Sequence, residues 1–301
     1  MNAFWQHFAD GILTGAIIAL GAIGVSLAMS ILRFANFAHA ELLTAGAYIA
    51  LMVVAAIGSL GDPIDPFSFG WPFVVSLVPA AAATAVLALV IDRLVFRSLR
   101  QRKAARMTLI FASFGVGLVV RNLIHVIFGG EPEYYSRELT IAMRLFGTIR
   151  VMPDQIVVLV IATLLVVLLQ LFLRYSAMGL AMRAAAENPD LARVSGVDVD
   201  RVVAWTWALA AALAAMAGVF LGLTVQLRPE MGFNLLLALF AAAILGGNGS
   251  LIGAVVGGLL VGLAENLSVM VISSGYRQAV PFVLLVVMLF IRPQGLFGVR
   301  T

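Results

Sequence analysis

Cysteine is absent from this 301-residue sequence, and charged residues are scarce. Without cysteine the chain can form no disulfide, no thiolate nucleophile and no cysteine-ligated metal site. Only 11% of the residues are charged and 62% are hydrophobic, whereas a soluble domain is about a quarter charged and about half apolar. A soluble core cannot absorb this excess of apolar residues. The composition therefore indicates a membrane protein.

The sequence also lacks the motifs of nucleotide hydrolysis and of common hydrolytic or metal-dependent catalysis. Its single lysine, Lys103, stands in a basic loop with no glycines before it, so there is no phosphate-binding loop. The three histidines are far apart, no His-Glu-x-x-His occurs, and no serine stands in a Gly-x-Ser-x-Gly elbow. We therefore expect a non-catalytic chain with no metal and no cofactor, and we assign ATP hydrolysis, if it drives the protein, to other subunits.

Apolar runs long enough to cross a membrane fill most of the chain, since a spanning helix needs about 20 such residues. A further uncharged stretch, residues 231–264, is interrupted at 245–250 by glycine and asparagine, which favour two half-helices around a break. The sequence thus predicts an all-α, polytopic transmembrane helical bundle with broken or re-entrant helices, one domain over residues 1–301, and about eight or nine passes. The clearest runs are Gly11–Leu32, Leu42–Gly61, Trp71–Ile91, Met107–Val120, Gln155–Leu173, Val202–Leu227 and Gln278–Ile291.

The arginines cluster between apolar runs, which is a topology signal and not a nucleic-acid-binding patch. Residues 92–106 carry six cations against one acid, so the positive-inside rule places them in the cytoplasm. By alternation, residues 58–70, 129–154 and 228–230 lie outside, and residues 174–201 lie in the cytoplasm. Arg292 and Arg300 predict a cytoplasmic C-terminus.

Small residues recur at four-residue spacing, which lets membrane helices approach closely. The pairs are Gly11/Gly15, Gly218/Gly222, Gly253/Gly257 and Gly258/Gly262, although glycine is frequent in membrane helices in any case. Residues 36–48 and 246–258 are both breaks rich in small residues that follow an apolar helix. Paired interruptions of this kind are typical of inverted-repeat transporters, so an inverted repeat is possible.

Candidate pathway residues occur at both breaks: Asn36, His39, Glu41, Thr44, Asn248 and Ser250. Polar groups at membrane depth usually face a cavity or a partner, and unwound backbone there is tolerated in a cavity wall or inside protein. Asn36 and His39 would line the solute pathway, with Glu41 paired to Arg33 or His39. The alternative is that these groups cap the helix from Leu42 at the lipid headgroups, and that the second break is a structural hairpin.

Two further polar features have simpler explanations. Arg121 and His125 share one helix face, where they would snorkel to the outer headgroups. Glu265 and Asn266 are expected to be interfacial.

The cytoplasmic segment 174–201 has the pattern of two helices. One helix would end near Glu187, and Asn188 would cap a short second helix that begins at Pro189 and closes at Gly196. A helical loop of this kind suits docking to another protein, although a solvated hairpin without a partner fits the same residues. The candidate coupling residues are Arg183, Ala184, Ala185, Glu187, Asn188, Pro189, Asp190 and Gly196.

Residues 179–197, Gly-Leu-Ala-Met-Arg-Ala-Ala-Ala-Glu-Asn-Pro-Asp-Leu-Ala-Arg-Val-Ser-Gly-Val, resemble the cytoplasmic loop of branched-chain amino acid ABC importer permeases. Residues 36–48, residues 243–254 and the C-terminal Arg292-Pro-Gln-Gly-Leu-Phe-Gly298 agree with the same family, in its shorter Liv-H-like type. The resemblance spans essentially the whole chain. Ala40 departs from the glycine expected there, which affects only local backbone geometry.

The resemblance implies a permease subunit of a prokaryotic inner-membrane importer for branched-chain amino acids or related small solutes. It further implies a second related permease, two cytoplasmic ATPase subunits and an extracytoplasmic solute-binding protein as partners. Membrane lipid is the partner expected of the apolar helices. Relatives that import urea or short amides leave the solute open. An ion-coupled secondary transporter and a passive channel are alternatives of other classes, but the first should carry buried carboxylates or an ion cage.

Overall fold

The computed structural model describes residues 2–57, 63–136, 141–145, 149–247 and 249–298. Eight helices in this part of the chain are long and apolar enough to cross a membrane, which confirms the predicted helical bundle. In chain order the elements are α1 Asn2–Leu32, α2 Ala38–Ile57, α3 Trp71–Ile91, a π-helical turn Asp92–Phe96, α4 Arg97–Gln101, α5 Arg106–Phe128, β1 Met143–Leu145, β2 Ile149–Val151, α6 Pro153–Tyr175, α7 Ala177–Glu187, α8 Pro189–Val194, α9 Val199–Thr224, α10 Met231–Gly246, α11 Leu251–Ser268, a 3₁₀ turn Ser274–Ala279 and α12 Val280–Ile291.

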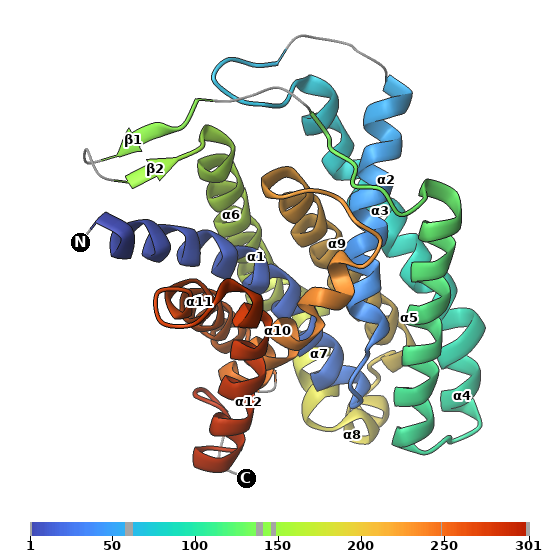
Figure 1. The fold of residues 1–301 in the computed structure, drawn as a ribbon. Helices are drawn as coiled ribbons and strands as arrows, with labels where there is room; N and C mark the ends of the chain where they lie inside the picture. The colour runs from blue at the N-terminus through green and yellow to red at the C-terminus, as the bar shows by residue number, and fades with distance from the viewer. Residues whose placement is uncertain (1, 58–62, 137–140, 146–148, 248, 299–301) are drawn as a thin grey trace.

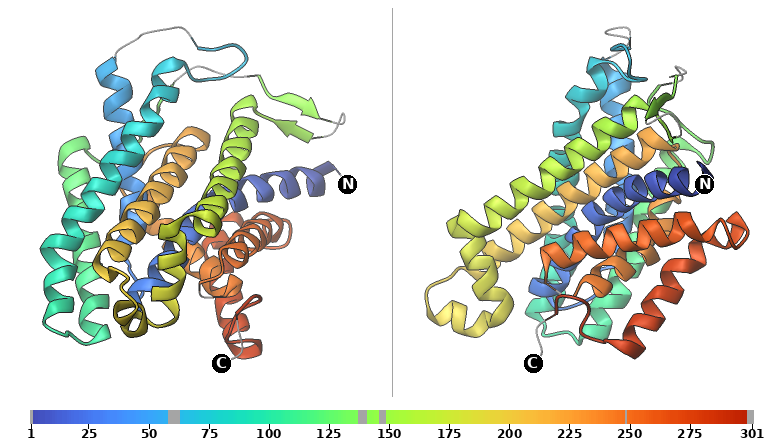
Figure 2. Two further views of the ribbon diagram at one scale, coloured as in Figure 1. Left: turned by 180° about the vertical axis from the view of Figure 1, so that it is seen from behind. Right: turned by 90° about the vertical axis from the view of Figure 1, so that its left-hand side faces the viewer.

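The bundle has two ends, which Figures 1 and 2 show at the top and the bottom of the ribbon. The upper end carries the β1–β2 hairpin and the start of α6, and we refer to it as the hairpin end. The lower end carries α4, α7, α8 and the C-terminus, and we refer to it as the α8 end. The helix α1 crosses the bundle obliquely, because its N-terminal Gln6 bonds Arg150 of β2 while Arg33, just past its C-terminus, bonds the end of α7.

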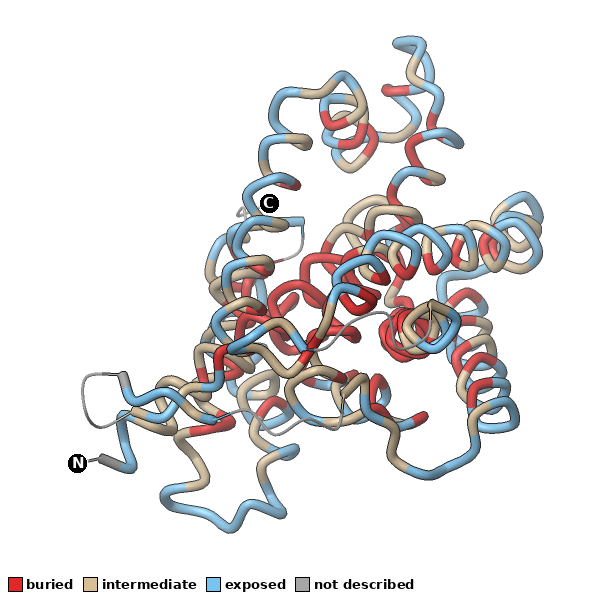
Figure 3. The backbone as a smooth tube through the Cα atoms, turned by 90° about the horizontal axis from the view of Figure 1, so that it is seen from above, coloured by how far each residue is buried: buried red, intermediate tan, exposed pale blue. Residues whose placement is uncertain are grey.

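The buried centre consists of α1, α2, α9 and α10. Figure 3 shows buried residues concentrated in the middle of the bundle. By contrast, α5, α6 and α12 bury few of their apolar residues. Outward-facing apolar helices are stable only against lipid or another apolar protein surface. The arrangement therefore suits a bilayer.

The predicted glycine pairs bring helices together. A Cβ at Gly11 would lie 2.9 Å from Leu263 Cα, and one at Gly15 would lie 2.8 Å from Leu259 Cα, both on α11. On the α11 side, Gly258 faces Ala19 and Gly262 faces Gly15, so the two predicted pairs meet each other across one seam. A side chain at any of these positions would push α1 and α11 apart.

The break between α1 and α2 is shorter than expected from the sequence. The second helix begins at Ala38 and not at Leu42, because the Asn36 side-chain oxygen accepts a hydrogen bond from Ala38 N at 3.2 Å. The predicted cytoplasmic loop after Ile91 is also largely helical. A π-helical turn joins α3 to α4, and Arg100 closes it with two bonds to Asp92 at 2.7 and 3.0 Å.

The second break is present as predicted, because α10 ends at Gly246 and α11 begins at Leu251. The 16 residues of α10 rise about 24 Å, short of the roughly 30 Å of a hydrocarbon core. The C-terminal segment packs against the end of α10, where Leu296 N donates to Leu245 O at 2.8 Å and Phe297 N donates to Gly246 O at 3.0 Å. The family-like C-terminal motif thus satisfies carbonyls that the break leaves open.

Both breaks lie at the α8 end, since Gly249 N donates to Ser26 near the end of α1 at 3.1 Å. An inverted repeat places corresponding breaks at opposite ends of a bundle. Residues 36–48 and 246–258 therefore do not support the inverted repeat. A smaller departure from an all-α fold is the β1–β2 hairpin, which pairs Met143 with Val151 and Leu145 with Ile149.

Candidate functional site

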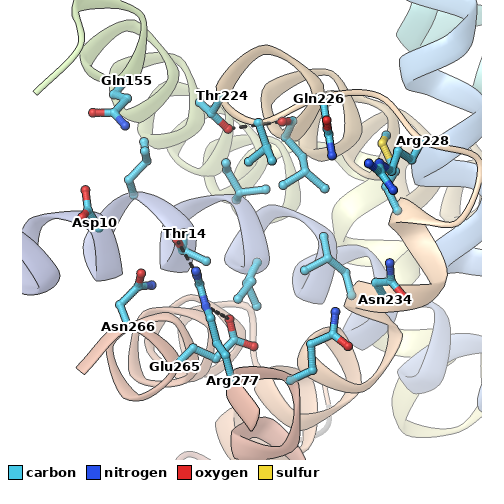
Figure 4. A pocket seen from close by; sticks show the side chains of 18 residues that line it. Asp10, Thr14, Gln155, Thr224, Gln226, Arg228, Asn234, Glu265, Asn266 and Arg277 are labelled. Atoms are coloured by element: carbon cyan, nitrogen blue, oxygen red, sulfur yellow. Dashed lines mark hydrogen bonds and ion pairs between the residues drawn. The ribbon is translucent and has the colours of Figure 1, made fainter. Parts of the chain in front are cut away.

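A polar cavity of about 470 Å³ lies over one face of α1, and its lining includes Gln155 from the start of α6, at the hairpin end (Figure 4). Its walls are the α9–α10 turn, the start of α10, the last turn of α11 and the 3₁₀ turn before α12. The polar lining residues are Asp10, Thr14, Gln155, Thr224, Gln226, Arg228, Asn234, Glu265, Asn266, Arg277 and Gln278. A cavity with this lining is unusual in an apolar bundle and marks a candidate solute site.

Both signs of charge face this cavity. Arg277 points between Thr14 and Glu265 in Figure 4, with its Nε 3.6 Å from Glu265 Oε2 and its Nη2 3.5 Å from Thr14 Oγ1. Asp10 and Arg228 add one acid and one cation at other edges of the cavity. The chemistry on offer is ion pairing and hydrogen bonding, which binds a polar solute without reacting with it.

Local contacts hold the walls in place. Asn266 donates to Gly262 O at 2.8 Å, which fixes its amide against the last turns of α11. The α9–α10 turn is attached to the loop after α5, because Glu133 and Leu227 exchange backbone hydrogen bonds of 3.0 and 2.8 Å. Nearby, burial raises the pKa of Tyr135 well above its usual range, so the phenol stays neutral and donates to Ala47 O at 2.8 Å.

Four of the predicted pathway residues lie elsewhere, inside the bundle. Asn36, His39, Glu41 and Thr44 are all buried on or before the first turns of α2. Asn36 caps the helix, as the alternative explanation held, but none of the four sits at a lipid interface. His39 Nε2 lies 3.1 Å from Gly21 O of α1, and Thr44 Oγ1 accepts from Gly232 N of α10 at 3.0 Å. These contacts join α2 to its neighbours, and none of the four residues lines the polar cavity.

The predicted partner of Glu41 is wrong. Its Oε1 accepts hydrogen bonds from Arg121 of α5, from Nη2 at 2.6 Å and from Nε at 3.0 Å, and it contacts neither Arg33 nor His39 in this way. Arg121 therefore does not snorkel outward, and its guanidinium also stacks over the Phe233 ring at 4.1 Å. A buried carboxylate is more stable beside a guanidinium than alone, which overrides the attraction of the headgroups.

Ser250 lines a second cavity, of about 390 Å³, at the α8 end. This cavity lies between the end of α1, the end of α6, α7 and the start of α11, and it also contains Arg174 and Arg183. Ser250 itself caps α11 by accepting from Gly253 N at 3.0 Å. The other predicted residue of this break, Asn248, lies outside the described residues.

The predicted pair of helices is present in the segment that resembles the family loop. Helix α7 ends at Glu187, and Asn188 caps α8 by accepting from Asp190 N and Leu191 N at 3.1 and 3.0 Å. Gly196 closes it with φ +88°, a left-handed conformation that glycine adopts without strain. We refer to residues 177–196 as the coupling hairpin.

The coupling hairpin has a buried and an exposed side. Ala185 is only 1% exposed and packs with Met182 and Val202, so it cannot belong to a docking surface as the sequence suggested. Leu191 and Val194 are 63% and 87% exposed, and the sequence interpretation missed them. Arg183, Glu187, Asn188 and Asp190 are also exposed, whereas Ala184 and Pro189 are half-buried.

The α1–α2 junction is tied to this hairpin. Arg33 donates to Ala186 O and Glu187 O at 3.2 and 3.1 Å, so it satisfies carbonyls at the end of α7. It adopts φ +59°, which is uncommon for a residue with a side chain. A displacement of the coupling hairpin would therefore move the end of α1.

The sequence interpretation also missed most of the polar cavity. Glu265 and Asn266 were expected at the interface, but both are buried in the cavity wall. Asp10 and Arg277 were not singled out, although each is an ionisable residue beside a long apolar run. That property was the available signal.

The sequence matches known permease components along nearly its whole length. The sequence model of a family described as "Branched-chain amino acid transport system / permease component" matches residues 8–289. The high-affinity branched-chain amino acid transport system permease protein LivH of Escherichia coli (strain K12) is 33% identical over 301 residues, covering 98% of this chain and 96% of that protein. The corresponding permease BraD of Pseudomonas aeruginosa is 30% identical, with coverage of 98% and 96%.

A solved structure shows a related fold. The chain is similar to one in a structure of PsaBC from Streptococcus pneumoniae in complex with Fab, with a TM-score of 0.52 and 13% identity. The similarity covers 98% of this chain and 94% of that one. At this identity the likeness concerns the fold alone.

Proposed function

This chain belongs to the family of permease components of branched-chain amino acid transport systems, and we propose that it lines the membrane pathway by which an ATP-driven importer carries those amino acids. It is a multi-pass membrane protein of the permease type. The observation that supports the proposed pathway is the polar cavity with charges of both signs inside an otherwise apolar bundle.

We assign the hairpin end to the outside and the α8 end to the cytoplasm. The six cations of residues 92–106 lie at the α8 end, together with the coupling hairpin and the C-terminus. Under the positive-inside rule this end faces the cytoplasm. The polar cavity then opens outward, where an extracytoplasmic binding protein would release its solute.

The exposed surfaces of the bundle support the proposed partners. We propose that Leu191 and Val194 of the coupling hairpin seat in one of two cytoplasmic ATPase subunits. The exposed apolar helices, such as α12, offer contact area for lipid and for a second related permease. ATP hydrolysis is then a property of the ATPase subunits, and this chain contributes the pathway.

The arrangement of α1 suggests how ATP-driven movement reaches the pathway. This helix borders the polar cavity at residues 10–18 and the second cavity at residues 27–31. Between these two stretches α1 packs against α10, where Gly21 meets Leu239, and against α11, where Ala19 meets Gly258. Because Arg33 ties the C-terminal end of α1 to the coupling hairpin, closure of the ATPases would shift α1 and open one cavity while closing the other.

The test is reconstitution of the complete complex in liposomes with the loaded binding protein. We expect uptake of leucine, isoleucine or valine that requires ATP, and no ATPase activity in the purified chain alone. Uptake driven by an ion gradient without ATP would instead indicate a secondary transporter. Uptake of urea or short amides in place of amino acids would retain the transport class and change the solute.

A further inference from the structure

The two Arg–Glu pairs of the bundle differ in geometry. Arg121 holds Glu41 with bonds of 2.6 and 3.0 Å, within the range of a strong charge-assisted hydrogen bond. Arg277 and Glu265 approach only to 3.6 Å, and Arg277 reaches Thr14 at 3.5 Å. The first pair is a closed structural contact. The second leaves most of the five guanidinium N–H donors of Arg277 without a short bond.

The Arg277–Glu265 pair lies at the polar cavity, whereas the space beside the Arg121–Glu41 pair is too small for a solute. Glu265 is 9% exposed and Arg277 is 38% exposed, and both border a space of about 470 Å³. The small hollow next to Glu41 and Arg121 measures only about 10 Å³. A solute of amino-acid size can therefore reach Arg277 and Glu265 and cannot reach the inner pair.

We infer that the Arg277–Glu265 pair recognises the zwitterionic head group of the transported amino acid, a specificity role that rests on the proposed function. The guanidinium takes the α-carboxylate in a two-bond contact, and the Glu265 carboxylate takes the α-ammonium. The solute enters between the two side chains. Arg277 then pairs with the α-carboxylate in place of Glu265, and Glu265 pairs with the α-ammonium in place of Arg277. No charge is left unpaired in the low-dielectric wall, which would be costly.

The arrangement selects against solutes that lack one of the two charges. An amide such as leucinamide has no carboxylate for Arg277, and urea has neither charge. Such a solute would have to separate the pair without replacing both contacts. The side chain of a branched-chain amino acid would face the apolar part of the lining, where Leu13, Ile17 and Leu235 lie.

The first measurement is leucine uptake by the reconstituted complex with wild-type chain, Arg277→Gln, Glu265→Gln and Arg277→Lys. We expect Arg277→Gln and Glu265→Gln to lower the uptake rate at least tenfold, because each removes a charge-assisted contact to the solute. Arg277→Lys should retain part of the rate, since the charge remains. The matched control is Arg144→Gln, an exposed arginine on β1 away from the cavity, which should transport like the wild type. Co-purification of all subunits shows that each variant assembles.

The second measurement does not depend on turnover. The chain has one lysine, Lys103, in the segment we assign to the cytoplasm, so Arg277→Lys adds the one lysine of this chain that an impermeant amine reagent can reach from the outside. Peptide mapping separates its label from that of the N-terminal amine. We expect leucine to protect this amine from labelling in the assembled complex and equimolar leucinamide to leave it reactive. Equal protection by both compounds, or by neither, would overturn the inference.

The outcomes separate the inference from the proposed function. If the wild-type complex imports no amino acid, the proposed function and the inference both fail. If the wild-type complex imports leucine and assembled Arg277→Gln does so at the same rate, only the inference fails. Loss of uptake in Arg277→Gln, partial rescue in Arg277→Lys and leucine-specific protection together support it.

Discussion

At the scale of single residues, burial decides the role of each polar group in this bundle. Glu41 and Arg121 come from helices that are distant in sequence, and each would carry a large desolvation cost without the other. Their position between α2, α5 and the Phe233 ring of α10 makes them a clamp on three helices. Arg277 and Glu265 have the same chemistry at a cavity, where the contact can be exchanged.

The clamp predicts strong coupling between its two members. Arg121→Leu and Glu41→Leu should each lower the free energy of unfolding by about 3–5 kcal/mol, because each leaves one buried charge unpaired. The double variant should lose less than the sum of the two single variants. Thermal unfolding of the purified chain in detergent measures all three. Additive losses would show that the two side chains act independently.

Sequence patterns located the polar positions of the first break but not their partners. Asn36 was expected either in the pathway or as a helix cap, and the cap is what the structure shows. The pairing of Glu41 with a residue eighty positions away depends on which helices are neighbours. No local spacing contains that information, so the predicted pairing with Arg33 or His39 was wrong.

At the scale of helices, small residues fix which elements touch. The α1–α11 seam forms because glycines on both helices allow the backbones to meet. Gly115 on α5 provides a contrast, since a Cβ there would meet no atom within 4 Å. Equal substitutions at the two sites should therefore have unequal effects.

Gly15→Leu should destabilise the protein and Gly115→Leu should not. The added side chain at Gly15 would overlap the α11 backbone, and overpacking of this kind costs about 1–3 kcal/mol. The midpoint of thermal unfolding in the same detergent compares the two variants. A similar midpoint for both would mean that the seam is loosely packed.

The coupling hairpin makes a separate prediction about docking. Leu191→Asp combined with Val194→Asp should leave the fold unchanged, because both side chains point to solvent. Loss of two buried apolar side chains at an interface should weaken ATPase binding at least about tenfold. Co-purification of the ATPase subunits and solute-stimulated ATP hydrolysis measure the effect.

Two controls accompany that variant. Ile141 is an apolar residue, 89% exposed, that lies just before β1 at the hairpin end of the bundle. Because it is far from the coupling hairpin, Ile141→Asp should not affect ATPase binding. Ala185→Trp should instead lower the unfolding temperature, because Ala185 is packed against Met182 and Val202. Normal ATPase binding by the Leu191→Asp, Val194→Asp double variant would exclude α8 as the docking surface.

At the scale of the whole molecule, the distribution of charge sets the orientation in the membrane. The α8 end carries segment 92–106, with six cations against one acid, whereas segment 129–154 near the hairpin end is mixed in charge. The polar cavity and the coupling hairpin lie at opposite ends of the bundle, so the proposed orientation places them on opposite sides of the membrane.

The natural absence of cysteine allows a direct test of this orientation. Single cysteines are introduced at three exposed positions, Arg102, Glu131 and Gln294. The cysteine at 131 should react with reagent from the outer side, and those at 102 and 294 should react only from the cytoplasmic side. Labelling of intact cells with an impermeant thiol reagent distinguishes them. Reaction of Arg102→Cys in intact cells would invert the orientation and with it the assignment of the polar cavity.

The sequence by itself determined the membrane setting, the helical class, most helix positions, the form of the coupling hairpin and the family. Hydropathy, caps such as Asn188 and glycine spacing are local properties, so they can be derived one segment at a time. Only the tertiary structure decided which polar residues share a cavity. Asp10 is separated from Glu265 and Arg277 by most of the chain, and it meets them because the glycine seam brings the end of α11 against the start of α1.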